Sequence, residues 1–152
     1  MKIIFATNNP NKLAEIQNAL GDDFDLVSLK DIGFEGEIPE TGRTLEANAL
    51  QKATFIFDRY KVPVFADDTG LEVACLNGLP CVDTAHYSGS RDADANIQKL
   101  LSETRFHEDR SAAFRTVIAF IAEMDKKLFS GEIQGRIAEA KSGKEGFGYD
   151  PV

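Results

Sequence analysis

The chain has 152 residues, of which 43% are hydrophobic and 28% charged, and its formal net charge at pH 7 is −8. This composition is typical of one soluble globular domain, long enough to bury a core without disulfides or a structural metal. The negative charge argues against a nucleic-acid-binding protein, because capture of many phosphates needs a basic surface. An acidic enzyme can still bind one nucleotide where a metal ion and a few lysines offset the phosphate charge locally.

The N-terminal stretch MKIIFATNNP is too short in its apolar part for a signal peptide or a membrane span. We therefore expect a cytoplasmic protein without a membrane partner. Cys75 and Cys81 are six residues apart, a spacing that fits no zinc ribbon, redox pair or disulfide framework. Both are predicted to be buried structural thiols.

The first predicted elements are a strand over residues 2–6, a polar loop TNNPN, and a helix over residues 11–20. One of the loop asparagines is expected to cap this helix. A strand, loop and helix in this order would present free backbone amides and the positive end of a helix dipole to an anion. Lys12 would stand at the rim of that site.

A second strand is predicted at residues 25–29, followed by an exposed loop over residues 33–42 and a helix over residues 45–60 capped by Thr44. Asn48 and Lys52 lie four residues apart on this helix, so their side chains can point the same way. The spacing leaves two interpretations open: a shared polar site, or ordinary solvated surface, which the spacing alone favours.

The apolar run over residues 62–66 predicts a strand buried on both faces that ends in Asp67 and Asp68. Neighbouring side chains on a regular strand point to opposite faces, so a pair that shares one task is expected where the strand ends and turns. Gly70 makes such a turn plausible. The alternative is a solvated turn in which one aspartate caps backbone amides.

The remaining chain predicts a short helix over residues 92–101, capped by Asp92 or Ser90, and a long antiparallel hairpin. Its strands are residues 112–123 and 128–138, which flank the polar turn MDKK. Early alternation of strands and helices with a late hairpin indicates an α/β fold with a mixed sheet. In GFGYDP the aromatic residues favour either a loop that stacks on a base or a loop tucked into the core.

Four stretches in this order resemble one family, the non-canonical purine nucleoside triphosphate pyrophosphatases that act on inosine and xanthosine triphosphates. They are TNNPNKLAEI, ETGRTLEANALQKA, FADDTGLEVACLNGLPCVDTAHYSG and SGKEGFGYDPV. The resemblance covers the whole chain. It implies two lobes on a long mixed β-sheet flanked by helices, with the substrate in a cleft between the lobes, and it implies a homodimer.

The resemblance also implies the reaction: hydrolysis of dITP, ITP or XTP between the α and β phosphates, giving a monophosphate and pyrophosphate, with Mg²⁺ required. Asp68 would be the general base, and Glu40, Asp67 and Asp68 would hold the metal, which suits the preference of Mg²⁺ for carboxylates, waters and phosphate oxygens. The resemblance and the residue types together predict that the substrate contacts Thr7, Asn8, Asn9, Pro10, Asn11, Lys12, Asn48, Lys52, Thr69, Phe147, Gly148, Tyr149 and Asp150.

Two features depart from the family pattern. Cys81 replaces the usual glycine, and a residue with a Cβ would be strained if this position needs a positive φ. The resemblance predicts further chain after Val152, with residues that read the purine base, so residues 1–152 are expected to be a single pyrophosphatase domain truncated at its C-terminus.

Other functions stay open at this point. One alternative is a related pyrophosphatase for pyrimidine or modified nucleotides, which the stretch GFGYDP disfavours. Another is a truncated fragment that binds nucleotide without turnover. A basic nucleic-acid binder is disfavoured by the charge.

Overall fold

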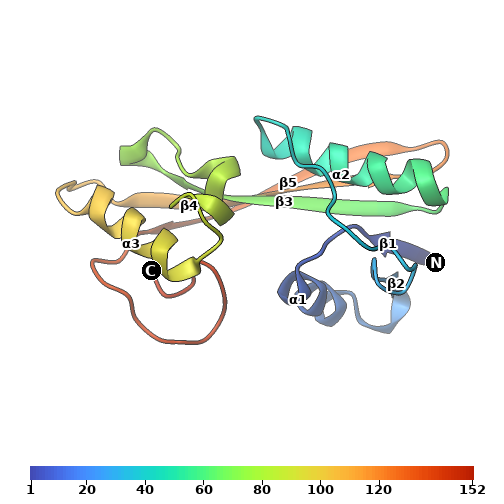
Figure 1. Cartoon of the computed structure of the whole chain (residues 1–152), viewed down its shortest axis with the longest axis horizontal. Helices are drawn as coiled ribbons and strands as arrows, with labels where there is room; N and C mark the ends of the chain where they lie inside the picture. Colours follow the sequence, from blue (N-terminus) through green and yellow to red (C-terminus); the bar gives the residue numbers. More distant parts are fainter. The chain divides into compact units, whose positions relative to one another are not determined.

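The computed structural model describes residues 1–152 and shows an α/β fold with a five-stranded mixed sheet, as predicted (Figure 1). The strands are β1 (Lys2–Phe5), β2 (Asp25–Val27), β3 (Val64–Val73), β4 (Ser111–Ile121) and β5 (Lys126–Arg136). The α-helices are α1 (Pro10–Leu20), α2 (Leu45–Tyr60) and α3 (Ala93–Thr104). Three short 3₁₀ turns complete the elements: η1 (Gly21–Asp23), η2 (Ala74–Leu76) and η3 (Cys81–His86).

The strand order in the sheet is β2-β1-β3-β4-β5. β1 pairs in parallel with both β2 and β3, with Ile4 opposite Val27 on one side and Val64 on the other. β4 and β5 are separated only by residues 122–125, too short for a parallel crossover, so they form the predicted antiparallel hairpin. Ala122 and Asp125 bond each other's backbone in its turn.

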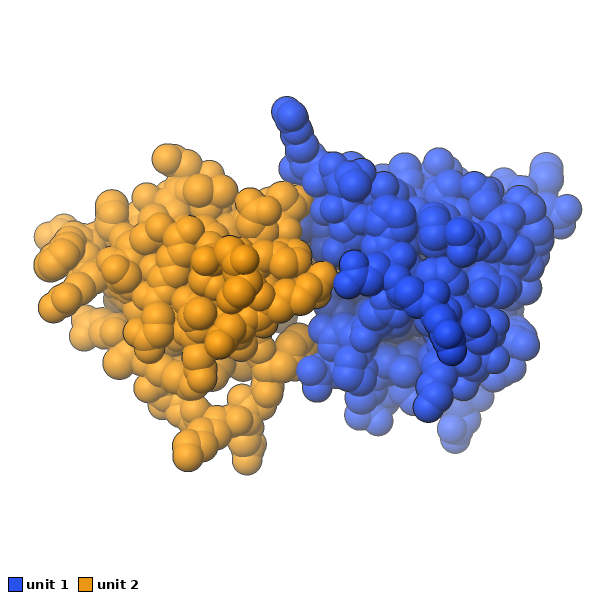
Figure 2. Space-filling model, in the orientation of Figure 1, with its two compact units in different colours: residues 1–68, 117–130 blue, residues 69–116, 131–152 orange.

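The chain divides into two compact units, shown in different colours in Figure 2. Unit 1 is residues 1–68 and 117–130, and unit 2 is residues 69–116 and 131–152. Unit 1 buries an apolar core that includes Ile4, Phe5, Leu45, Ile56 and Val64. The core of unit 2 is built from Leu71, Val73, Tyr87, Ile97, Leu100, Ala112, Ile137 and Tyr149.

The helix starts follow the predicted capping chemistry. Asn9 caps α1, Thr44 caps α2 and Asp92 caps α3, in each case with a side-chain oxygen that accepts from the first turn. No helix of the structure is both long and apolar enough to cross a membrane.

Strand β3 is longer than predicted, which corrects the interpretation of the aspartate pair. The strand does not end at Asp68 but continues to Val73, and Leu71 and Val73 enter the core of unit 2. Gly70 makes no turn: a Cβ there would lie 2.8 Å from the carbonyl oxygen of Cys81. The glycine is needed for the close approach of a second backbone, and this requirement is invisible in the local sequence.

Cys81 has a φ of 44°, so the position does adopt the positive φ at which a residue with a Cβ is strained. Both cysteines are free, and each is partly exposed, so the prediction of fully buried thiols is wrong. The backbone at Cys81 is fixed by the contact with Gly70 and by the hydroxyl of Thr84, which donates to the Cys81 carbonyl at 2.5 Å.

Candidate active site

The loop after β1 leads into the first turn of α1 through a tight cap. The side-chain oxygen of Asn9 accepts hydrogen bonds from the backbone N–H of Asn11 at 2.9 Å and of Lys12 at 3.5 Å. Pro10, the first residue of the helix, has no N–H. The expectation of free amides at this helix start is therefore wrong for these positions, because Asn9 occupies them. The positive end of the helix dipole remains.

Thr7 and Asn8 hold the loop that precedes the cap. The hydroxyl of Thr7 accepts from the backbone N–H of Asn9 at 3.1 Å, and the side-chain amide of Asn8 donates to the carbonyl of Gly36 at 3.1 Å. In this part of the chain the side chain of Lys12 is the cationic group. An anion at the loop would meet this ammonium group first.

Lys12 joins α1 to the aspartate pair on β3. Its ammonium group donates to Oδ2 of Asp67 at 2.6 Å, across 55 residues of sequence. Asp67 is buried, with 7% of its surface exposed, and Lys12 is partly buried. A charged pair in such surroundings is stronger than one on the surface, because less water screens it.

Helix α2 contributes two buried polar side chains to the same unit. Asn48 is 4% exposed and Lys52 is 7% exposed, so the alternative of ordinary solvated surface is wrong. The ammonium group of Lys52 donates to the carboxylate of Glu40 in the loop before α2. The residues at 40, 48 and 52, predicted as part of one site, are thus brought together.

The same loop is also held through Thr41, Gly42 and Gln51, which the sequence did not predict as site residues. The backbone N–H of Thr41 donates to the side-chain oxygen of Gln51 at 2.9 Å, and that of Gly42 donates to the side-chain oxygen of Asn48 at 2.7 Å. Gln51 lies three residues after Asn48, so helical spacing alone places it near the same face and could have identified it.

Several of the other predicted residues lie close enough to Asp68 to shift the pKa of its carboxyl group. Burial raises the pKa of Asp68 above its usual value of 3.8, and the nearby carboxylate of Glu40 raises it further. The charge of Lys52, the side chain of Asn48 and the charge of Lys12 lower the pKa, but burial prevails. Oδ2 of Asp68 is buried and has no hydrogen-bond partner. A buried carboxylate oxygen without a partner is costly in a folded protein unless a ligand uses it.

The carboxylates of this cluster are candidate ligands for a divalent cation. No group of three or more His, Cys, Asp or Glu side chains lies close enough to form a complete metal site. Mg²⁺ does not require one, since it keeps waters and is commonly bound by one or two carboxylates plus substrate phosphates. Glu40 and the unbonded oxygen of Asp68 supply ligands of this kind, and the two lysines match phosphate oxygens. The donor set therefore fits Mg²⁺ bound together with a nucleoside phosphate.

The other predicted substrate residues lie in unit 2. The hydroxyls of Thr69 and Thr116 are 2.8 Å apart. Asp150 accepts from the backbone N–H of Phe147 at 2.8 Å, so it closes the turn that contains Gly148. This turn fixes the backbone around Phe147, whose ring is partly exposed.

Tyr149 behaves as a core residue. It is 5% exposed, and its hydroxyl donates to the carbonyl of Thr84 at 2.9 Å. Burial raises the pKa of Tyr149 to about 12. For this aromatic residue the structure agrees with the alternative of a loop tucked into the core, while its contact with substrate stays a prediction.

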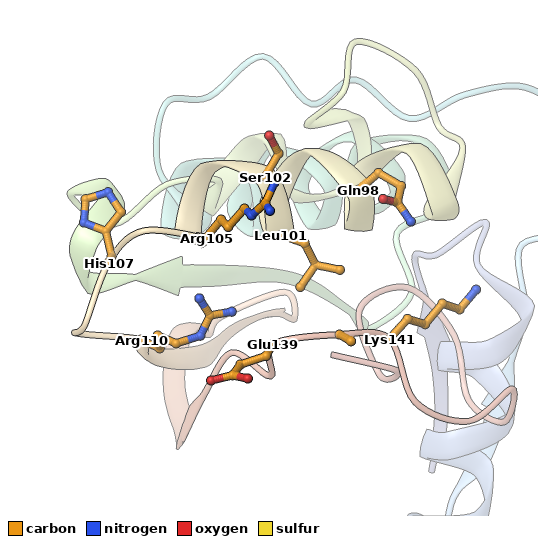
Figure 3. A pocket seen from close by; sticks show the side chains of 9 residues that line it. Gln98, Leu101, Ser102, Arg105, His107, Arg110, Glu139 and Lys141 are labelled. Atoms are coloured by element: carbon orange, nitrogen blue, oxygen red, sulfur yellow. The ribbon is translucent and has the colours of Figure 1, made fainter.

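A cavity of about 740 Å³ lies in unit 2 beside α3 (Figure 3). It is lined by Gln98, Leu101, Ser102, Arg105, His107, Arg110, Glu139, Ala140 and Lys141. None of the predicted site residues is among them. The guanidinium group of Arg110 donates to the backbone carbonyls of Thr104, Ile137 and Ala138, so this charge is used to hold backbone.

Proteins of similar sequence agree with the family resemblance of the four motifs. A sequence model described as "Ham1 family" matches residues 3–152. The chain is 51% identical over 153 residues to the dITP/XTP pyrophosphatase of Porphyromonas gingivalis, covering 99% of this chain and 79% of that protein. It is 46% identical to the dITP/XTP pyrophosphatase of Flavobacterium johnsoniae, covering 100% of this chain and 80% of that protein.

Solved structures show the same similarity. The Ham1 protein of Staphylococcus aureus superposes with a TM-score of 0.89 at 36% identity, covering 100% of this chain and 80% of that one. The family match over nearly all residues, the sequence identities and this superposition together show that the chain belongs to the Ham1 family.

Proposed function

We propose that this chain is a nucleoside triphosphate pyrophosphatase that hydrolyses dITP and XTP to the monophosphate and pyrophosphate. Relatives named as dITP/XTP pyrophosphatases are 43–51% identical to this chain over nearly its whole length. The observation that carries the proposal is the unbonded buried oxygen of Asp68, in a cluster that also contains two lysines, one ion-paired with Asp67 and the other with Glu40.

The lysines are proposed to bind the triphosphate. Lys12 and Lys52 are each paired with a carboxylate, and both act electrostatically on Asp68. Phosphate oxygens can replace these carboxylates as partners, because an ammonium group is a point charge with three donors. Thr7, Asn8 and the positive end of the α1 dipole would support the same phosphates.

Glu40 and Asp68 are proposed to hold Mg²⁺, with Asp67 beside them. When bound, Mg²⁺ would offset the charge of the triphosphate and make the α-phosphorus easier to attack. The carboxylate of Asp67 accepts from the ammonium group of Lys12 at 2.6 Å and would hold it near the phosphates.

Asp68 is proposed to act as the general base. Its carboxylate takes a proton from the attacking water while the oxygen of that water bonds to the α-phosphorus, and the bond from this phosphorus to the bridging oxygen breaks to release pyrophosphate. Burial raises the pKa of Asp68, and a less acidic carboxyl is a better proton acceptor.

Other parts of the proposal rest on the family resemblance. In the substrate site, we propose that Phe147 stacks on the base, with Gly148, Tyr149 and Asp150 nearby. For the whole protein, we propose two lobes with a substrate cleft between them, a homodimer, a cytoplasmic location, and residues 1–152 acting as one domain. Each stays a prediction.

The test is to measure pyrophosphate and orthophosphate separately after incubation of the chain with dITP, XTP or ATP, with and without Mg²⁺. We expect pyrophosphate from dITP and XTP, little from ATP, and none without Mg²⁺. Orthophosphate as the main product would contradict the reaction type. Nucleotide binding without any product would show a protein that binds but does not turn over.

A further inference from the structure

The loop segment Glu40–Gly42 is fastened to one face of α2 by three side chains. Lys52 pairs with the carboxylate of Glu40, Gln51 accepts from the backbone of Thr41 at 2.9 Å, and Asn48 accepts from the backbone of Gly42 at 2.7 Å. Residues three and four apart on a helix lie side by side, so these contacts run in order along the segment.

The Gln51 contact has a second part. The side-chain amide of Gln51 donates to the hydroxyl of Thr41 at 3.0 Å, while its oxygen accepts from the Thr41 backbone. Both ends of the amide are therefore engaged, which fixes its orientation. The residue next to Glu40 is held at its backbone and at its side chain.

The Asn48 contact is equally specific, because it requires a glycine. A Cβ at position 42 would lie 2.7 Å from the Asn48 side-chain oxygen and 2.7 Å from Cβ of Ala47, which are distances that real Cβ atoms do not show. Asn48 is buried, so the anchor on α2 is rigid. The backbone of the segment can lie this close to α2 only without a side chain at Gly42.

Binding of a cation by Glu40 would affect the ion pair of Lys52 but not the hydrogen bonds of Gln51 and Asn48. The ion pair with Lys52 involves the Glu40 carboxylate itself and would change as that charge is shared. The contacts of Gln51 and Asn48 do not touch the carboxylate, so they persist. They keep the Glu40 backbone in place within a connection between β2 and α2 that contains no helix or strand.

We propose that Gln51 is a positioning residue that, with Asn48, holds Glu40 ready to bind the divalent cation; this rests on the proposed function. A ligand carried by a loop loses conformational freedom on binding, and a loop that is already fastened loses less. Removing the Gln51 contact should therefore weaken cation binding while the chemistry with bound cation stays intact.

The experiment uses Mn²⁺ as the probe, with its binding to the whole chain followed by electron paramagnetic resonance. Gln51→Ala should raise the Mn²⁺ dissociation constant by about threefold to tenfold, which is the effect expected from the loss of one or two exposed hydrogen bonds. The Mg²⁺ concentration for half-maximal pyrophosphate release should rise by a similar factor, with kcat at saturating Mg²⁺ nearly unchanged. Gln17→Ala on the exposed side of α1 is the matched control and should change neither value.

Unchanged Mn²⁺ affinity in Gln51→Ala would overturn the proposal, as would a loss of kcat alone. If Gln51→Ala does not fold, Thr41→Ala removes the hydroxyl at the other end of the contact and should weaken Mn²⁺ binding, while Thr41→Ser should restore it. Absence of Mn²⁺ binding and of turnover in the unaltered chain would overturn the proposed function as well. Normal turnover with unchanged affinity in the variants would overturn only the role of Gln51.

Discussion

Buried charged side chains have different kinds of partner in the two units. In unit 2, Arg110 donates to three backbone carbonyls, and Asn96 accepts from the backbone of Ser88 at 2.7 Å and donates to the carbonyl of Ala85 at 3.0 Å. In unit 1, Asn48 also accepts from backbone, but the charged side chains of Lys52 and Asp67 pair with other charged side chains, and one oxygen of Asp68 has no partner.

The difference separates structural polar groups from those available to a ligand. A backbone carbonyl is fixed by the fold, so a side chain bonded to it serves the same purpose in every state of the protein. A charged side chain can exchange its partner when a phosphate or a cation arrives. The comparison predicts that polar substitutions in unit 1 affect activity most, and those in unit 2 affect stability most.

The largest expected effect is on activity at Asp68. Asp68→Asn should lower kcat for pyrophosphate release from dITP by about 10²- to 10⁴-fold, because the amide cannot accept the proton from water. The measurement is steady-state kinetics at saturating Mg²⁺. Asp58→Asn, an exposed residue of α2, is the control and should retain full activity. A kcat within a factor of about two of the unaltered chain would remove Asp68 from the mechanism.

A large effect on stability is expected at Arg110. Arg110→Met should lower the free energy of unfolding by about 3 kcal/mol, because the carbonyls of Thr104, Ile137 and Ala138 lose their donor. Urea unfolding measures this change. Arg91→Met, at an exposed position of the same unit, should have little effect. If the two variants unfold alike, the guanidinium group does not stabilise unit 2.

The smallest expected change is a gain at Cys81. Cys81→Gly should raise the free energy of unfolding by about 0.5–1 kcal/mol, because glycine has no Cβ and adopts a φ of 44° without strain. Thermal unfolding would detect a higher Tm, and Cys75→Ala serves as the control for loss of a thiol. A lower Tm for Cys81→Gly would show that the contact of its thiol with Glu72 outweighs the backbone strain.

Much of the fold could be predicted from local sequence. The sequence predicts one of the loop asparagines, Thr44, and Asp92 or Ser90 as the helix caps, and the caps in the structure are Asn9, Thr44 and Asp92. The hairpin follows from two long strand patterns around a short polar turn. These signals lie within a few residues of the feature they determine, so a single sequence is enough to read them.

What the sequence did not predict depends on contacts between distant segments. The local sequence favours a turn at Gly70, but this glycine makes room for the backbone of Cys81. The spacing of Asn48 and Lys52 favours solvated surface over a site, and only the contacts of both side chains with the distant segment Glu40–Gly42 show otherwise. Tyr149 bonds the carbonyl of Thr84, 65 residues away, so its core position could not be read from GFGYDP.

The most direct test of the account is the pH dependence of stability in Asp68→Asn, measured by urea unfolding without divalent cations from pH 4 to pH 8. Because burial raises the pKa of Asp68 in the folded state, its ionised form costs stability; this cost is absent below the usual pKa of 3.8 and complete above the raised pKa. The account predicts that Asp68→Asn is more stable than the unaltered chain near neutral pH, that the gain shrinks as the pH falls, and that pyrophosphate release is lost. A variant that is less stable at every pH would show that Asp68 supports the fold and would contradict a site built for a ligand.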